Sequence, residues 1–133
     1  MKIILVNYRY FVSGGPERYM FNVKELLENH GHEVIPFSVK HNNNEPCEYD
    51  KYFVSPIGSG DVTYFSESSK TNIHEIRKFF SRMFYSYEVR RNFKKLIIDT
   101  TPDIVYVLHY QNKLSPSFIE IAKKFNLPVI QRV

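Results

Sequence analysis

The fold of this chain is most constrained by two apolar, β-branched runs, at residues 2–8 and 103–109, with helical patterns between them. Near-continuous apolar runs of this length are typical of strands that are buried on both faces of a parallel sheet. Weaker strand patterns lie at residues 33–39 and 128–133, and residues 51–54 predict another short strand. Neither long run approaches the roughly 20 apolar residues of a membrane span. We therefore expect the runs to form the centre of a buried sheet.

Two helices are predicted between these strands, at residues 16–30 and 115–126. Apolar side chains recur in both at helical spacing, Pro16 and Pro116 suit first turns, and Gly31 suits the position after a last turn. The order strand, helix, strand at each end of the chain predicts βαβ units. The fold class is therefore α/β, a doubly wound, Rossmann-like parallel sheet with helices on both faces. A chain of 133 residues buries one such core, so we expect a single domain over residues 1–133.

The middle of the chain predicts a basic helix over residues 72–99, flanked by loops at residues 40–50 and 55–70. Arg90 and Arg91 interrupt its apolar stripe, so we expect a kink or two helices there. Segment 77–95 supplies much of the net charge of +4. One interpretation is a solvated basic face on a helix packed against the sheet; the other is peripheral contact with an anionic membrane surface.

The single cysteine, Cys47, excludes an intramolecular disulfide and a cysteine-built zinc site. The apolar start of the chain is too short for a signal peptide, so we expect a cytoplasmic protein, peripheral at the inner membrane surface if the basic segment binds lipid. Phe and Tyr fall mostly on apolar faces rather than forming a base-stacking platform, so we expect no nucleic-acid partner. A basic nucleic-acid module built on segment 77–95 stays as a further alternative, testable by salt-dependent binding.

The loop at Gly14 and Gly15 lies where the first strand hands over to the first helix. Doubly wound folds bind ligands at this carboxyl edge of the sheet, and free N–H groups at a helix start favour a phosphate oxygen. Pro16 lacks an N–H, so Gly14, Gly15 and Glu17 would have to donate. Neither a Walker A loop nor the three-glycine dinucleotide fingerprint is present. The alternative is a tight turn, with Glu17 favourably placed in the dipole of its own helix.

His109 ends the second long apolar run, and Gln111 and Asn112 follow it. In a doubly wound sheet this strand is often the neighbour of the first, which would place His109 beside the glycine loop. There it could donate to a substrate hydroxyl or phosphate, or act as a general acid or base. The alternative is a loop histidine bonded to backbone. The other histidines show no metal-ligand spacing, and Cys47 has no evident activating base, so we predict neither a metal site nor covalent catalysis.

Four segments carry a pattern that extends over most of the chain: residues 1–6, the loop Gly14-Gly15-Pro16-Glu17, the helix end at residues 26–34 (Leu-Leu-Glu-Asn-His-Gly-His-Glu-Val), and residues 102–109 (Pro-Asp-Ile-Val-Tyr-Val-Leu-His). Together they resemble the N-terminal domain of retaining glycosyltransferases of family 4, the group 1 enzymes with the GT-B fold. The resemblance implies transfer of a sugar from a nucleotide-diphosphate donor to a glycan or lipid-linked acceptor, with no metal cofactor. It places Gly14 and Gly15 near the donor diphosphate and the acceptor, and His109 less directly.

Two departures from the family pattern are visible. The donor-binding C-terminal domain, with its paired glutamates, is absent from these 133 residues. The family histidine beside the donor sugar would follow the last strand and lie beyond Val133, so no catalytic residue is assigned. We expect the chain to be a truncated GT-B half, a fragment of a longer two-domain enzyme that is inactive alone and able to form a homodimer through an exposed edge at residues 130–133.

A second function class stays open beside the transferase. A stand-alone doubly wound domain could bind a phosphorylated ligand or act as a regulatory module. Flavodoxin-like and receiver-like versions would need a flavin loop or a phosphoacceptor Asp at a strand end, whereas the long runs end in Asn7-Tyr8 and Leu108-His109. The sugar donor, the nucleotide and the acceptor are not specified by any residue identified above.

Overall fold

The structure is a computed structural model that describes residues 1–56, 71–110 and 114–132, with the helical backbone alone for residues 71–83. The elements follow in this order: β1 (Lys2–Asn7), α1 (Gly15–Asn29), β2 (Glu33–Phe37), the 3₁₀ turn η1 (Asp50–Tyr52), α3 (Thr71–Thr100), β3 (Ile104–His109), α4 (Ser117–Lys124) and β4 (Val129–Gln131). None of the helices in these ranges combines the length and the apolar character needed to cross a membrane.

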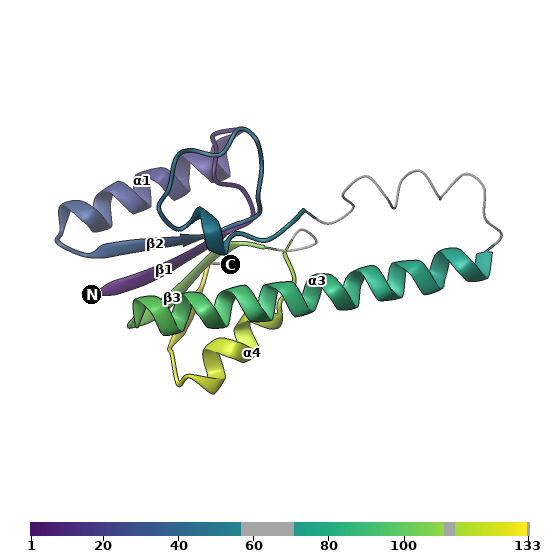
Figure 1. The fold of residues 1–133 in the computed structure, drawn as a ribbon. Coiled ribbons are helices and arrows are strands. Elements are labelled where there is room, and N and C mark those ends of the chain that lie inside the picture. The colour runs from purple at the N-terminus through teal and green to yellow at the C-terminus, as the bar shows by residue number, and fades with distance from the viewer. Residues whose placement is uncertain (57–70, 111–113, 133) are drawn as a thin grey trace.

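The four strands form one sheet in the order β2-β1-β3-β4, and all neighbouring pairs are parallel. In the registers, Ile4 of β1 faces Ile35 of β2 on one side and Val105 of β3 on the other. Figure 1 shows α1 over one face of the sheet and α3 and α4 over the other. The predicted α/β class, parallel sheet and two-sided helical cover are therefore confirmed, and the arrangement is compatible with a Rossmann-like fold.

The core has two layers because strand residues alternate between the faces of the sheet. Ile4 and Val6 belong to the larger cluster, which includes Phe93 of α3 and Phe118 of α4. Leu5 belongs to the smaller cluster, which includes residues of α1 and of the loops. The long apolar runs are thus explained by burial on both faces, as their composition predicts.

Helix α1 ends where the sequence predicts. Gly31 adopts a left-handed backbone (φ +84°), which glycine reaches without steric cost. The N–H of Gly31 donates to the Glu28 carbonyl at 3.0 Å, and that of His32 to the Leu27 carbonyl at 3.1 Å. This pair of bonds is the Schellman motif, so Gly31 occupies the position just after the cap, as predicted.

The predicted kink at Arg90 and Arg91 is wrong, because α3 is one continuous helix over Thr71–Thr100. Val89, Phe93 and Leu96 are fully buried at helical spacing, so the core stripe passes the arginine pair without a break. Both arginines are exposed, and arginine is a good helix former. Two consecutive residues on a helix differ by about 100°, which lets both lie on the solvent side.

The strand predicted at residues 51–54 is also corrected. Asp50–Tyr52 forms a 3₁₀ turn, and Val54 makes only an isolated parallel bridge with Val39. Tyr52 and Val54 pack into the larger cluster, and Phe53 packs into the smaller one. The consecutive apolar residues Tyr52, Phe53 and Val54 therefore reflect insertion into both core layers beside β2, and not a strand paired along its length.

Candidate functional site

The carboxyl ends of β1 and β3 lie side by side. Asn7 pairs with His109 in the sheet register, and the N–H of Tyr8 donates to the His109 carbonyl at 2.9 Å. The predicted adjacency of these strands is confirmed, and the exposed His109 lies beside the start of the loop that leads to the glycines. The β1–β3 register shifts between Val6 and Asn7. Irregularities of this kind re-aim side chains and are common next to functional sites.

A hydrogen-bonded chain holds the loop between β1 and α1. Arg9 Nη1 donates to Ser13 Oγ at 2.7 Å, and Ser13 Oγ donates to Glu17 Oε2 at 3.0 Å. The Glu17 side chain is only 2% exposed, although it belongs to the first turn of α1. Its carboxylate therefore stabilises the loop from the buried side by accepting the hydrogen bond from Ser13. At 2% exposure the Glu17 side chain is not available to contact a ligand.

Aromatic and cationic side chains form a continuous row along the same edge. The Arg9 guanidinium carbon lies 4.9 Å from the Tyr8 ring centroid and 5.7 Å from that of Phe11. The Phe11 ring stacks on His41 with centroids 4.4 Å apart, and the Tyr8 ring lies 5.1 Å from His109. We call these five residues the edge row. They follow β3, β1 and β2, three neighbouring strands of the sheet.

Buried oxygens without partners gather beside the edge row. Within the described part of the chain, the buried side-chain atoms that lack a hydrogen bond are Asn7 Oδ1, Ser38 Oγ and Asn44 Oδ1. Asn7 and Ser38 are each 1% exposed and directly follow the paired residues Val6 and Phe37. Buried polar atoms are normally bonded, because leaving one unpaired costs about 1–3 kcal/mol. Among the buried side-chain atoms of the described residues, oxygens without a hydrogen bond thus occur at the carboxyl edge of the sheet.

Neither glycine of the loop is required by the backbone or by packing. Gly14 is extended (φ −174°), and a Cβ there would lie 3.7 Å from Glu17 Oε2, an ordinary contact. A Cβ on Gly15 would meet nothing within 4 Å. Two missing side chains instead leave the backbone at the start of α1 uncovered. The N–H groups and the dipole at that helix end favour an anion.

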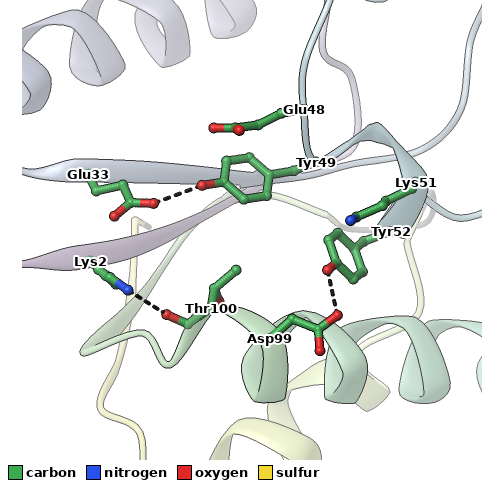
Figure 2. A pocket seen from close by; sticks show the side chains of 8 residues that line it. All are labelled: Lys2, Glu33, Glu48, Tyr49, Lys51, Tyr52, Asp99 and Thr100. Carbon is green, nitrogen blue, oxygen red and sulfur yellow. Dashed lines mark hydrogen bonds between the residues drawn. The ribbon is translucent and has the colours of Figure 1, made fainter.

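A pocket lies at the opposite, amino end of the strands (Figure 2). This amino-end pocket has a volume of about 490 Å³ and is lined by Lys2, Glu33, Glu48, Tyr49, Lys51, Tyr52, Asp99 and Thr100. Its groups largely bond one another: the Tyr49 hydroxyl donates to Glu33 at 2.8 Å, and that of Tyr52 to Asp99 at 2.6 Å. Lys2 Nζ donates to the Thr100 carbonyl at 3.1 Å. These bonds join the carboxyl-terminal end of α3 and the loop before it to the starts of β1 and β2, and we call the pocket a structural seam for this reason.

Burial and hydrogen bonding in this seam raise the pKa values of two tyrosine hydroxyls. The bond to Asp99, with burial as the second cause, raises the pKa of Tyr52 to about 12. Burial and the bond to Glu33 raise the pKa of Tyr49 well above its usual range. Both phenols therefore remain neutral donors at physiological pH. Neither is suited to act as a base there.

Cys47 is half-buried and accepts a hydrogen bond from the Tyr49 N–H at 3.3 Å. Burial raises the pKa of its thiol, so little thiolate forms at neutral pH, which disfavours nucleophilic chemistry. In residues 1–56, 84–110 and 114–132, no group of three His, Cys, Asp or Glu side chains is placed to hold a metal ion. Two of the predicted binding residues, Gln111 and Asn112, lie outside the described residues.

Sequence reasoning identified the glycine loop and His109 but missed most of the edge row. Arg9 was visible as the charged residue just after a buried strand, which is where parallel sheets place ligand-binding groups. His41 carried no such signal, because its stacking on Phe11 joins residues that are distant in the sequence. The buried Asn7 and Ser38 were likewise hidden within apolar strand patterns.

No protein-family model matches the sequence, and a search of curated proteins finds no relative.

Proposed function

We propose that this chain forms the acceptor-side domain of a GT-B glycosyltransferase, an enzyme that transfers a sugar from a nucleotide-diphosphate donor to a glycan or lipid-linked acceptor with retention. The proposal takes its reaction type from the resemblance of the strand, glycine-loop and helix-end motifs. The observed parallel sheet, with the Gly14-Gly15 loop between β1 and α1, is compatible with it.

The observation that carries the proposal is the meeting of three features at one edge of the sheet. The uncovered start of α1, the edge row and the unpartnered oxygens of Asn7 and Ser38 all follow the carboxyl ends of β1, β2 and β3. Ligands of doubly wound sheets bind in this position. The amino-end pocket, by contrast, has its polar groups bonded to one another.

The chemistry of these groups fits a sugar that carries phosphate. The Arg9 guanidinium presents five donors in a planar fork, of which one is bonded to Ser13, and such forks bind phosphate oxygens. The partly exposed rings of Tyr8 and Phe11 can pack against the apolar face of a sugar ring. His109 is accessible beside them and can donate to a hydroxyl or a phosphate oxygen.

A stand-alone domain that binds a phosphorylated ligand is the second candidate function. Arg9 and the start of α1 favour it, because anion binding alone would use both without any group transfer. The two functions would use the same site, but only the transferase would turn over a nucleotide sugar.

The decisive experiment measures transfer and donor hydrolysis by the full-length gene product that carries residues 1–133, over a panel of UDP-, GDP- and ADP-sugars. The Gly15→Trp variant should fold, since nothing lies within 4 Å of a Cβ there, and should lose at least about tenfold in turnover by blocking the site. The matched control is Asn22→Trp, at an exposed position of α1. Turnover that survives in Gly15→Trp contradicts the placement of the active site at the glycine loop. Binding of a sugar phosphate without any turnover supports the second candidate.

A further inference from the structure

The outer face of α3 exposes large apolar side chains that the fold leaves uncovered. Phe84 is 68% exposed, Tyr87 64% and Ile98 55%. At about 100° per residue, these positions fall on one side of the helix, directly opposite the buried Val89 and Phe93. Figure 1 shows α3 as a straight helix along the outside of the molecule, with the sheet on its inner side.

Cations share this face, and the two acids of the same helix segment lie at its border with their carboxylates hydrogen-bonded within the protein. Arg91, Lys94 and Lys95 are exposed at the same angular positions as the apolar residues. Glu88 accepts hydrogen bonds from the Ser55 N–H at 2.9 Å and its hydroxyl at 3.1 Å, and Asp99 accepts one from Tyr52. We call Phe84, Tyr87, Arg91, Lys94, Lys95 and Ile98 the outer stripe.

Arg90, although exposed, is not part of the outer stripe. Its guanidinium forms an ion pair with Glu120 of α4, so its charge is committed within the protein. In the described half of α3, the charge of segment 77–95 therefore forms a stripe in which three cations lie between two aromatic residues and one aliphatic residue.

We propose that the outer stripe docks on an anionic lipid bilayer. Aromatic and aliphatic side chains can enter the headgroup region while neighbouring lysines and arginines meet the lipid phosphates. Aromatic residues are favoured at this depth because the membrane interface suits rings with one polar edge. A straight, exposed helix presents these groups along one line, which fits a flat surface.

The charge of the outer stripe argues against the simplest other occupant. A second copy of the chain would bring the same three cations against the first set, and like charges facing one another oppose association. The occupant must instead supply negative charge together with an apolar layer. The inference does not rest on the proposed transferase activity, because it uses a different face and a different ligand.

The test is co-sedimentation of the 133-residue chain with vesicles of phosphatidylcholine, either alone or mixed with phosphatidylglycerol. The chain should sediment with the mixed vesicles and not with phosphatidylcholine alone. The double variant Phe84→Ser with Tyr87→Ser should weaken binding about tenfold or more. Each of Arg91→Gln, Lys94→Gln and Lys95→Gln should weaken it about fivefold at low salt.

Matched controls lie on α1, which covers the other face of the sheet. Leu26 is 56% exposed, and Leu26→Ser should leave vesicle binding unchanged, as should Arg18→Gln. All substituted side chains are exposed, and circular dichroism should show unaltered folding for each variant. Equal sedimentation of wild type and the Phe84→Ser, Tyr87→Ser variant overturns the proposal. So does binding of RNA or DNA through the stripe with no vesicle binding. The outcome of these binding assays does not depend on whether the protein has transferase activity.

Discussion

At the scale of single residues, the site depends on a buried carboxylate that faces away from solvent. Glu17 accepts a hydrogen bond from Ser13, and Ser13 accepts one from Arg9, so a buried carboxylate helps to orient the Arg9 guanidinium. Sequence position alone suggested that Glu17 would act on a ligand or on its own helix dipole. Its burial could not be predicted, because the loop that covers it has no regular pattern.

The first prediction concerns this relay. Ser13→Ala removes the hydroxyl that bonds the buried Glu17 carboxylate, and hydrogen bonds to charged groups contribute about 1.5–3 kcal/mol. We expect the free energy of unfolding to fall by an amount in this range, measured by urea titration with an unchanged slope. Asn22→Ala, at an exposed position of α1, should change it by less than about 0.5 kcal/mol. Equal effects of the two substitutions would show that the relay does not support the loop.

The second prediction is the pH dependence of the Tyr52–Asp99 bond. The pKa of Tyr52 is raised to about 12 in the folded protein, above its usual value near 10. The contribution of the Tyr52–Asp99 bond to the free energy of unfolding is therefore fully present below pH 10 and is lost as the pH rises through about 12. Urea midpoints across this window should fall less steeply in Tyr52→Phe than in wild type. Tyr87→Phe, at an exposed position, is the control, and a Tyr52→Phe curve parallel to that of wild type would refute the assignment.

At the scale of elements, helices and strands were largely predictable because each carries its own period. The two long apolar runs became the central strands β1 and β3, and Gly31 ended α1 as its position indicated. The wrong predictions concern segments whose local structure is decided by tertiary packing. Arg90 and Arg91 did not break α3, because the core side of the helix continues past them. Residues 52–54 form a short apolar run like a buried strand, but they insert into two core layers.

The third prediction tests the orientation of α3 with two phenylalanines on the same helix. Phe93 is fully buried, with its ring centroid 5.0 Å from that of Phe37 and 5.5 Å from that of Phe118. Phe93→Ala should lower the free energy of unfolding by about 3–5 kcal/mol. The exposed Phe84 should tolerate the same change within about 0.5 kcal/mol. Chemical denaturation of both variants is the measurement, and a reversed ranking would mean that the helix presents its other face to the sheet.

At the scale of the whole molecule, the two ends of the sheet have different characters. At the amino end, two tyrosine hydroxyls donate to carboxylates and Lys2 donates to a backbone carbonyl, which closes the seam between α3 and the strands. At the carboxyl end, buried oxygens stay unpaired and the start of α1 is uncovered. The sequence predicts binding at the carboxyl end, because ligands of doubly wound sheets bind outside the carboxyl ends of the strands. It could not predict the edge row, which depends on contacts among three separate loops.

Association of two copies through the edge at residues 130–133 stays a prediction. Ile130 lies on the edge strand β4 and is 52% exposed, which leaves apolar surface for pairing. Light scattering of wild type and Ile130→Lys at high concentration distinguishes the cases. The prediction is a larger mass for wild type alone, and a monomeric wild type contradicts it.

The measurement that most directly tests the central claim is amide chemical-shift mapping of the 133-residue chain during titration with nucleotide sugars and a simple sugar phosphate. A ligand site at the carboxyl edge predicts that perturbed amides cluster at residues 7–17, at residues 38–44 and at His109, and that Gly15→Trp abolishes the changes. Perturbations centred instead on Lys2, Tyr49 and Asp99 would place the ligand in the amino-end pocket. That result, or a titration without any perturbation across the panel, would contradict the account.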